Sequence, residues 1–341
     1  MSTAASTLDV DGLDIRFRTP HGDVHAVRDV SFSIEPGEIV ALVGESGSGK
    51  STIGFALMRL LEQEGPVAVR GKATFSGKQG PPRDLMKLSQ RAMRQGRGDD
   101  ISMIFQEPMS SLNPIFSVGG QIAEAIRVHQ GTSRKDAFAR ALEMLYVLGI
   151  PNPKECLASY PHQISGGMIQ RVMIAMAIAC DPKLLVADEP TTGLDVTIQA
   201  QIVEHLQNLQ RQKGMSILFI THDLGLVAEI ADRVLVMYAG QIVEVGEVKT
   251  IFESPRMPYT RALLNSLPTL GCSSIPGYRI LAIPGNVPTA SEFPAGCAFH
   301  PRCTHVETSL CDQYAPALEQ AAPDHLVRCL LWRHLNGAPV R

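Results

Sequence analysis

The first part of the chain alternates apolar and polar residues. Apolar side chains recur near a two-residue spacing over Leu8 to Phe17, and again over Val30 to Ile34 before the turn Pro36-Gly37. A two-residue period places successive side chains on opposite faces of a strand. The pattern therefore predicts strands of a half-exposed sheet at the start of the chain.

Continuous apolar runs then replace the alternation. These runs are Ile39 to Val43, Leu184 to Ala187, Ile217 to Ile220 and Val234 to Met237. Such runs are typical of parallel strands that are covered on both faces. Between them, Lys50 to Leu61 and Val196 to Gln212 have the spacing of amphipathic helices. The pattern predicts an α/β core.

Three further segments depart from this pattern. Residues 65–100 are rich in Gly, Arg and Gln, and we predict an exposed insertion there. Residues 114–180 are almost wholly helical in pattern, which predicts a helical lobe at about residues 109–180. After Gly246, prolines recur at close spacing and indicate a C-terminal extension. We divide the chain into a core of residues 1–250, which includes the lobe, and an extension of residues 251–341.

Composition narrows the class of protein. The chain has 341 residues, of which 45% are hydrophobic and 19% charged, with a net charge of -3. This is globular composition, and the charge gives no support to binding of nucleic acid. The apolar runs are shorter than the roughly 20 residues that span a bilayer, and the N-terminus lacks a secretory pattern. We therefore expect a cytoplasmic protein, in which disulfides are disfavoured.

One segment combines glycines, a lysine and a hydroxyl group at a spacing that suits a phosphate. Its residues are Gly44, Glu45, Ser46, Gly47, Ser48, Gly49, Lys50 and Ser51, followed by Thr52. The glycines let backbone N–H groups turn toward a β-phosphate, and the following helix adds its dipole. Lys50 would contact the β- and γ-phosphates, and Ser51 would bind Mg²⁺. The spacing predicts a P-loop that binds nucleotide, with a plain glycine-rich turn as the alternative.

A second segment ends an apolar strand with two acids, Asp188 and Glu189. Adjacent carboxylates repel, so a core strand tolerates them where a cation or water compensates. Beside a P-loop, Asp188 is expected to hold Mg²⁺, and Glu189 to orient or deprotonate the attacking water. The alternative is a solvated strand end. These two motifs alone are equally compatible with a nucleotide kinase or a GTPase.

A third motif precedes an apolar helix and consists of Ser165, Gly166 and Gly167. Ser165 can cap the helix, and the glycines let its first N–H groups approach a phosphate. Because one ATP does not need two such helix starts, we infer that this one completes the site of a neighbouring subunit. The alternative is a plain loop before a helix.

The order of these motifs resembles the ABC transporter ATPases throughout Leu8 to Gly246. The resemblance implies a P-loop NTPase core with an N-terminal antiparallel β subdomain, a helical subdomain and, in this chain, a small cysteine-containing extension. Ile164 to Met168 resembles the signature sequence, with Ile for the usual Leu and Met for the usual Gln. In the same comparison, Gly193-Leu194-Asp195 corresponds to the D-loop.

The resemblance also implies roles for single residues. Gln106 corresponds to the Q-loop glutamine, which senses the γ-phosphate and contributes to the Mg²⁺ site. His222 corresponds to the switch histidine, and Glu189 to the catalytic carboxylate. Relatives stack an aromatic residue on adenine, and the matching position here is His21, whose ring is smaller.

Other stretches resemble the ATPase subunits of dipeptide, oligopeptide and nickel importers. They are Glu107 to Pro114, Ser159 to Gln163, Asp195 to Gln201, Pro255 to Leu264 and Ile283 to Pro288. The resemblance implies ATP and Mg²⁺ as cofactors, with attachment to the cytoplasmic face of the cell (inner) membrane. It also implies as partners two membrane permeases, a second related ATPase and an extracytoplasmic substrate-binding protein.

These motifs do not identify the transported solute. We expect di- or oligopeptides, with nickel or another small solute as the alternative. An alternative from a different functional class is a soluble ABC ATPase that acts in DNA repair or translation. The single set of motifs and the net charge of -3 argue against it.

Four of the seven cysteines lie close together near the C-terminus: Cys297, Cys303, Cys311 and Cys329. Four thiols suit tetrahedral zinc or a [4Fe-4S] cluster, and four buried cysteines without a metal are the further alternative. The surrounding sequence resembles the C-terminal region of peptide-importer ATPases, which implies a [4Fe-4S] cluster. Cys272 lies outside this group.

Overall fold

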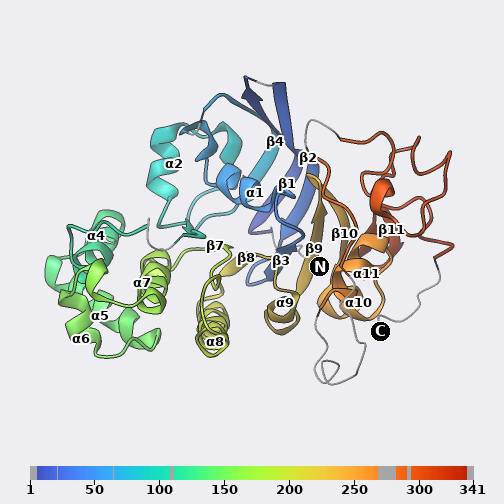
Figure 1. Ribbon diagram of the computed structural model, residues 1–341. Helices are drawn as coiled ribbons and strands as arrows, with labels where there is room; N and C mark the ends of the chain where they lie inside the picture. The colour runs from blue at the N-terminus through green and yellow to red at the C-terminus, as the bar shows by residue number, and fades with distance from the viewer. Residues whose placement is uncertain are drawn as a thin grey trace, which may run out of the picture.

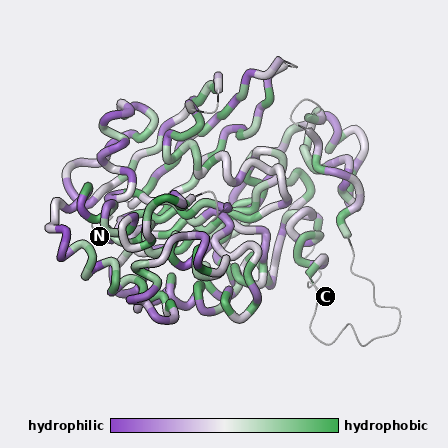
Figure 2. Tube along the Cα trace, turned by 60° about the vertical axis from the view of Figure 1, so that its left-hand side comes forward, coloured by the Kyte–Doolittle hydropathy of each residue, from purple (hydrophilic) through white to green (hydrophobic). Residues whose placement is uncertain are grey.

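The computed structural model describes residues 6–20, 22–63, 65–107, 111–267, 282–289 and 293–335. These residues form a four-stranded antiparallel sheet, an eight-stranded mixed sheet, a helical lobe beside them and a C-terminal extension on the opposite side (Figure 1). Apolar residues run through the middle of the molecule, while polar residues recur along its outer loops (Figure 2). The predicted α/β fold class is confirmed.

The N-terminal sheet has the strand order β2-β1-β4-β5. Its strands are β1 (Leu8–Thr19), β2 (Gly22–Ile34), β4 (Val67–Phe75) and β5 (Arg83–Asp84). Leu8 lies opposite Ile34 on one side and Phe75 on the other, and all three are fully buried. The prediction of an exposed insertion at residues 65–100 is therefore wrong, because β4 buries Ala73 and Phe75 against β1.

The eight-stranded sheet has the order β11-β12-β10-β9-β3-β8-β7-β6. Its parallel part consists of β3 (Ile39–Val43), β6 (Ile101–Ile104), β7 (Leu184–Asp188), β8 (Ser216–Thr221) and β9 (Arg233–Tyr238). Nearly all of these residues are buried, and the apolar runs that predicted β3, β7, β8 and β9 are confirmed. No run predicted β6. The antiparallel strand β10 (Gln241–Glu247) follows β9.

Three helices follow parallel strands: α1 (Lys50–Leu57) follows β3, α8 (Val196–Lys213) follows β7, and α9 (Leu224–Ile230) follows β8. Helix α2 (Gln90–Gly96) instead precedes β6. The helix predicted over Lys50 to Leu61 ends four residues early. Met58 closes α1, and Arg59 then adopts a φ of 53°, which no helix continues.

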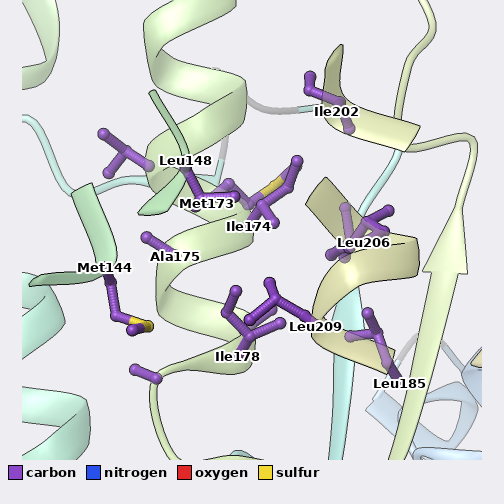
Figure 3. Close-up of a cluster of buried hydrophobic side chains, with 14 of the residues drawn as sticks. Met144, Leu148, Met173, Ile174, Ala175, Ile178, Leu185, Ile202, Leu206 and Leu209 are labelled. Carbon is purple, nitrogen blue, oxygen red and sulfur yellow. The ribbon is translucent and has the colours of Figure 1, made fainter. Parts of the chain in front are cut away.

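The helical lobe contains α4 (Val118–Gln130), α5 (Arg134–Val147), α6 (Pro153–Ala158) and α7 (Gly166–Ile178). Ser117, Ser133 and Ser165 begin three of these helices, each accepting a hydrogen bond from a backbone N–H of the first turn. Apolar side chains of α5 and α7 meet those of α8 and β7 in one buried cluster (Figure 3). This shared packing fixes the start of α7 relative to the sheet.

The C-terminal extension is built into the core. It includes α10 (Val248–Glu253), α11 (Pro258–Asn265), β11 (Glu319–Ala322) and β12 (His325–Val327). Strand β12 pairs with β10, with Val327 opposite Glu244, so the extension continues the main sheet. Met257, Tyr259 and Phe299 pack with Ala41 and Val43 of β3 in one apolar cluster. The proline-rich sequence did not predict that the extension would pair and pack with the main sheet.

Within the described residues, we find no helix with the length and apolar character needed to cross a membrane.

Candidate active site

The P-loop connects β3 to α1 and is shaped by close backbone contacts. Gly44 has a φ of 152° and Gly49 a φ of 101°, conformations that residues with a side chain rarely adopt. A Cβ atom at Gly44 would lie 2.1 Å from the carbonyl oxygen of Met237, and one at Gly49 would lie 2.6 Å from that of Ala26. Glycine is therefore required at both positions, and the loop leads directly into the N-terminus of α1.

Lys50 is the first residue of α1 and is almost fully buried. Its Nζ donates to the carbonyl oxygens of Gly44 and Glu45, at 2.8 and 3.0 Å. Burial lowers the pKa of Lys50, while the carboxylates of Glu189 and Asp188 oppose this effect. The ammonium group is thus held inside the loop, where a bound polyphosphate would provide compensating charge.

Ser51 and Asp188 form a hydroxyl–carboxylate pair. The Ser51 Oγ donates to Asp188 Oδ1 at 3.0 Å, and Asp188 ends β7 with only 1% of its surface exposed. Burial, together with the charge of Glu189, raises the pKa of Asp188 to about 6. Magnesium prefers hard oxygen ligands, so this buried acid beside a hydroxyl fits Mg²⁺ held together with phosphate oxygens.

Glu189 is the centre of a hydrogen-bond network. Gln106 Nε2 donates to Oε2 at 3.1 Å, Thr192 Oγ1 donates to the same oxygen at 2.9 Å, and His222 Nδ1 lies 3.0 Å from Oε1. Burial raises the pKa of Glu189, but the hydrogen bonds from His222 and Thr192 outweigh it, so the pKa lies below its usual value. The carboxylate is therefore ionised near neutral pH.

The backbone of Glu189 is in the left-handed region, with a φ of 46°. Its N–H donates to the carbonyl oxygen of Ile220 at 2.8 Å, which fixes the turn after β7. Non-glycine residues in this region store strain, and such strain is common where a side chain must be aimed at a reacting group. Here it directs the carboxylate toward Gln106 and His222.

The fold thus gathers the predicted residues of the P-loop, Gln106, Asp188, Glu189 and His222 at one end of the parallel sheet. The motif of Ser165, Gly166 and Gly167 lies elsewhere, at the start of α7. Ser165 and Gly166 are exposed, and the side chains nearest Gly167 are those of Leu194 and Ile198. In the part of the chain that the structure describes, no hydrogen bond or salt bridge joins this motif to the P-loop. His21 lies outside the described residues.

Sequence reasoning missed two residues of the extension that hold the P-loop. Arg302 forms a two-fold salt bridge to the Glu45 carboxylate, with distances of 2.7 and 3.0 Å, and its side chain is only 4% exposed. The Tyr259 hydroxyl accepts a hydrogen bond from the Glu45 N–H at 2.9 Å. Residue 302 lies 257 positions beyond Glu45. No local motif indicates such a contact.

The four C-terminal cysteines line one pocket, together with Pro258, Phe299 and other residues of the extension. Burial and repulsion among the neighbouring thiolates raise the pKa of Cys297 to about 11 and that of Cys329 to about 12. Among the described residues, no three His, Cys, Asp or Glu side chains have the arrangement of ligands to a single metal ion. Cys272 lies outside the described residues.

Comparison with protein-family models gives two matches. Residues 27–192 match the family described as ABC transporter, and residues 243–311 match the family described as oligopeptide/dipeptide transporter, C-terminal region. The first match covers the P-loop, the Q-loop and the two acids. The second covers the extension as far as residue 311, including three of its four clustered cysteines.

Curated relatives resemble nearly the whole chain. A putative peptide import ATP-binding protein of Brucella melitensis is 50% identical over 96% of this chain and 98% of its own length. The dipeptide transport ATP-binding protein of Escherichia coli is 48% identical, with 94% and 95% covered. The oligopeptide transport ATP-binding protein of Salmonella typhimurium is also 48% identical, with 94% and 92% covered.

Solved structures share the fold of the core. A dimeric ATP-binding cassette in a post-hydrolysis state with ADP and Pi superposes with a TM-score of 0.62 at 23% identity, covering 71% of this chain and 98% of that one. A Clostridium perfringens protein from an ABC transporter complex gives a TM-score of 0.59 at 27% identity, covering 73% and 91%. Both leave more than a quarter of this chain unmatched.

Proposed function

Because the chain belongs to the ATP-binding subunits of the peptide-importer family of ABC transporters, we propose that it hydrolyses ATP to drive import of di- or oligopeptides. The observation that carries the hydrolytic part is the network around Glu189. An ionised carboxylate lies between Gln106, Thr192 and His222, next to a buried lysine and a buried aspartate. Such a group can accept a proton from an attacking water.

The roles of the other residues follow from their chemistry. Lys50 and the N–H groups at the start of α1 neutralise the β- and γ-phosphates. Ser51 and Asp188, together with Gln106, would hold Mg²⁺, which would supply positive charge to the phosphate oxygens. His222 stabilises charge on the terminal phosphate and keeps the Glu189 carboxylate in place. Glu189 orients the water and takes its proton.

The active unit in this proposal is a dimer. Ser165, Gly166 and Gly167 form an exposed helix start that lies apart from the P-loop of the same subunit. Its free N–H groups suit an anion. We assign it to the ATP bound by a second, paralogous ATPase subunit, whose own signature motif would complete the site described above.

The remaining partners follow from the relatives. Proteins named for dipeptide and oligopeptide transport are 48% identical over almost the full length of this chain. We propose that two permeases hold the chain at the cytoplasmic face of the membrane, and that an extracytoplasmic binding protein delivers the peptide. Nickel or another small solute is the alternative cargo.

The test of the hydrolytic assignment is Glu189→Gln. This variant should bind ATP with unchanged affinity, while hydrolysis by the assembled complex falls by orders of magnitude. Lys50→Ala is the contrasting variant and should weaken ATP binding itself. Hydrolysis in Glu189→Gln within a few-fold of the wild type would refute the role of Glu189.

The test of the cargo uses the complex in liposomes. Addition of a radiolabelled dipeptide and its binding protein should raise ATP hydrolysis and lead to uptake, and neither should respond to Ni²⁺. Stimulation by Ni²⁺ alone would establish the alternative.

A second proposal concerns the four cysteines of the extension. Zinc–sulfur bonds of about 2.3 Å draw four thiolates tightly around a point, whereas a multi-iron core separates them more widely. The four thiols line one pocket, and among the described residues no three ligands are arranged for a single metal ion, so a [4Fe-4S] cluster is the metal we propose here in preference to zinc. Metal would replace the thiol protons that burial retains, and its binding free energy would add to the stability of the extension.

Metal content and stability test this second proposal. Protein purified without oxygen should contain about four iron atoms per chain and absorb visible light. Cys303→Ser should lower the iron content and the thermal stability, while Cys156→Ser, a buried cysteine of the helical lobe, should leave the iron unchanged. Protein without iron or zinc, in which the two variants behave alike, would leave the four cysteines as ordinary buried residues.

A further inference from the structure

A pocket opens on the far side of the P-loop from Glu189. Its floor consists of Ser46 and Gly47 of the P-loop with Val24, His25 and Ala26 of β2. The turn between β9 and β10 forms one side through Ala239 and Gly240. Its volume is about 310 Å³, at the lower end of the range of roughly 300–1,000 Å³ that is usual for small-molecule sites.

The sheet order fixes which end of a nucleotide reaches this pocket. The hydrolytic residues follow β6, β7 and β8, on one side of β3, whereas the pocket borders the turn after β9, on the other side of β3. The P-loop follows β3 itself. A triphosphate with its terminal phosphate near Glu189 therefore directs its ribose and base toward β9 and into the pocket.

The extension forms the remaining wall. Val287, Pro288, Thr289 and Phe293 line the same pocket as Ser46 and Gly47 of the P-loop. The Arg28 guanidinium lies 3.8 Å from the centre of the Phe293 ring and so stacks on it from β2. A flat ring held in this way, beside a proline and several aliphatic side chains, presents the kind of surface on which a heterocyclic base packs.

The floor of the pocket is held by backbone contacts. The Gly240 N–H donates to the Ser48 carbonyl oxygen at 2.9 Å, and the Arg28 N–H donates to the Gly240 carbonyl oxygen at 2.8 Å. These bonds tie the P-loop, the β9–β10 turn and β2 to one another. These three elements of the floor therefore keep a fixed spacing before any ligand binds, which lowers the cost of binding.

We propose that the C-terminal extension forms one wall of the base-binding part of the ATP site, with Pro288 and Phe293 contacting the purine ring. This proposal rests on the ATPase function proposed above and adds to it a role for the extension in nucleotide recognition. In consequence, the affinity for the base depends on Pro288 and Phe293, and the affinity for the phosphates does not.

The test compares ATP with inorganic tripolyphosphate, which has no base, on the purified full-length chain. Phe293→Ala should raise the Kd of ATP roughly tenfold and leave the Kd of tripolyphosphate unchanged. Phe293→Trp should restore ATP affinity. The matched control is Val306→Ala, an exposed residue of the same extension that does not line the pocket, and it should change neither Kd.

Two results would overturn the proposal. One is a Phe293→Ala variant with wild-type affinity for ATP, and the other is a loss of affinity equal for ATP and tripolyphosphate, which would mean a general disturbance of the P-loop. A failure of the proposed function looks different, since wild-type protein would then bind neither compound. If Phe293→Ala does not fold, the proposal is tested instead by photolabelling of the wild type with 8-azido-ATP. Label should appear in the peptide with residues 287–293, and its absence there would refute the proposal.

Discussion

The salt bridge between Arg302 and Glu45 predicts an unequal response to removal of its two partners. The Arg302 side chain is 4% exposed and that of Glu45 is 27% exposed, so water can hydrate the carboxylate but not the guanidinium. Breaking a buried pair costs about 3–5 kcal/mol when the remaining charge stays buried. We therefore expect Glu45→Gln, which leaves the buried cation, to cost about 3 kcal/mol.

Removal of the other partner should cost less. Arg302→Met keeps most of the packing volume and leaves a carboxylate that water can reach, although it also removes the hydrogen bond from Nε to the Pro284 carbonyl oxygen at 2.8 Å. A loss of about 1–2 kcal/mol is expected. The double variant Glu45→Gln/Arg302→Met should be more stable than Glu45→Gln alone, because it no longer holds an unpaired buried charge.

The assay is unfolding in urea, which gives the free energy for the wild type, both single variants and the double variant. The control is Arg333→Met. Arg333 pairs with Glu319 at 3.1 Å on the surface of the same extension, and such exposed pairs are worth about 0–1 kcal/mol. If Glu45→Gln costs no more than Arg333→Met, or less than Arg302→Met, the reasoning from burial is refuted.

Three further predictions concern the ATP site. Asp188→Asn should abolish hydrolysis but stabilise the nucleotide-free chain by about 2–3 kcal/mol at pH 8, since a folded pKa of about 6 makes the ionised acid costly. This gain in stability should shrink as the pH falls from about 6 to about 4, because the wild-type acid becomes protonated in that range. Urea unfolding at several pH values measures the gain, and a gain that does not change with pH would contradict the prediction. Ser165→Arg should leave ATP binding to the P-loop intact but block ATP-dependent dimerisation, as measured by gel filtration. If the variant forms dimers as the wild type does, the assigned interface is wrong. Gly49→Ala should reduce ATP binding at least tenfold in a fluorescence titration, because the added Cβ would lie 2.6 Å from the Ala26 carbonyl oxygen; unchanged binding would show that the loop adapts.

The sequence alone was sufficient for the parts of the protein that short-range patterns encode. Continuous apolar runs located the parallel strands β3, β7, β8 and β9 but not β6, the periodicity of residues 114–180 predicted the helical lobe, and the P-loop spacing located the phosphate site. Each of these depends on neighbours within one strand, one turn or one helix. The same reasoning failed at residues 65–100, where charged residues on the outer face of β4 obscured the buried Ala73 and Phe75.

Only the tertiary structure decided how the extension meets the core. The pairing of β12 with β10, the contacts of Arg302 and Tyr259 with Glu45, and the wall of Pro288 and Phe293 beside the P-loop all join residues far apart in the chain. Their partners are chosen by burial and by the geometry of the whole sheet, and no spacing along the chain records that choice. A local pattern specifies which groups a residue carries, whereas the folded chain alone determines which distant group lies within hydrogen-bonding distance of it.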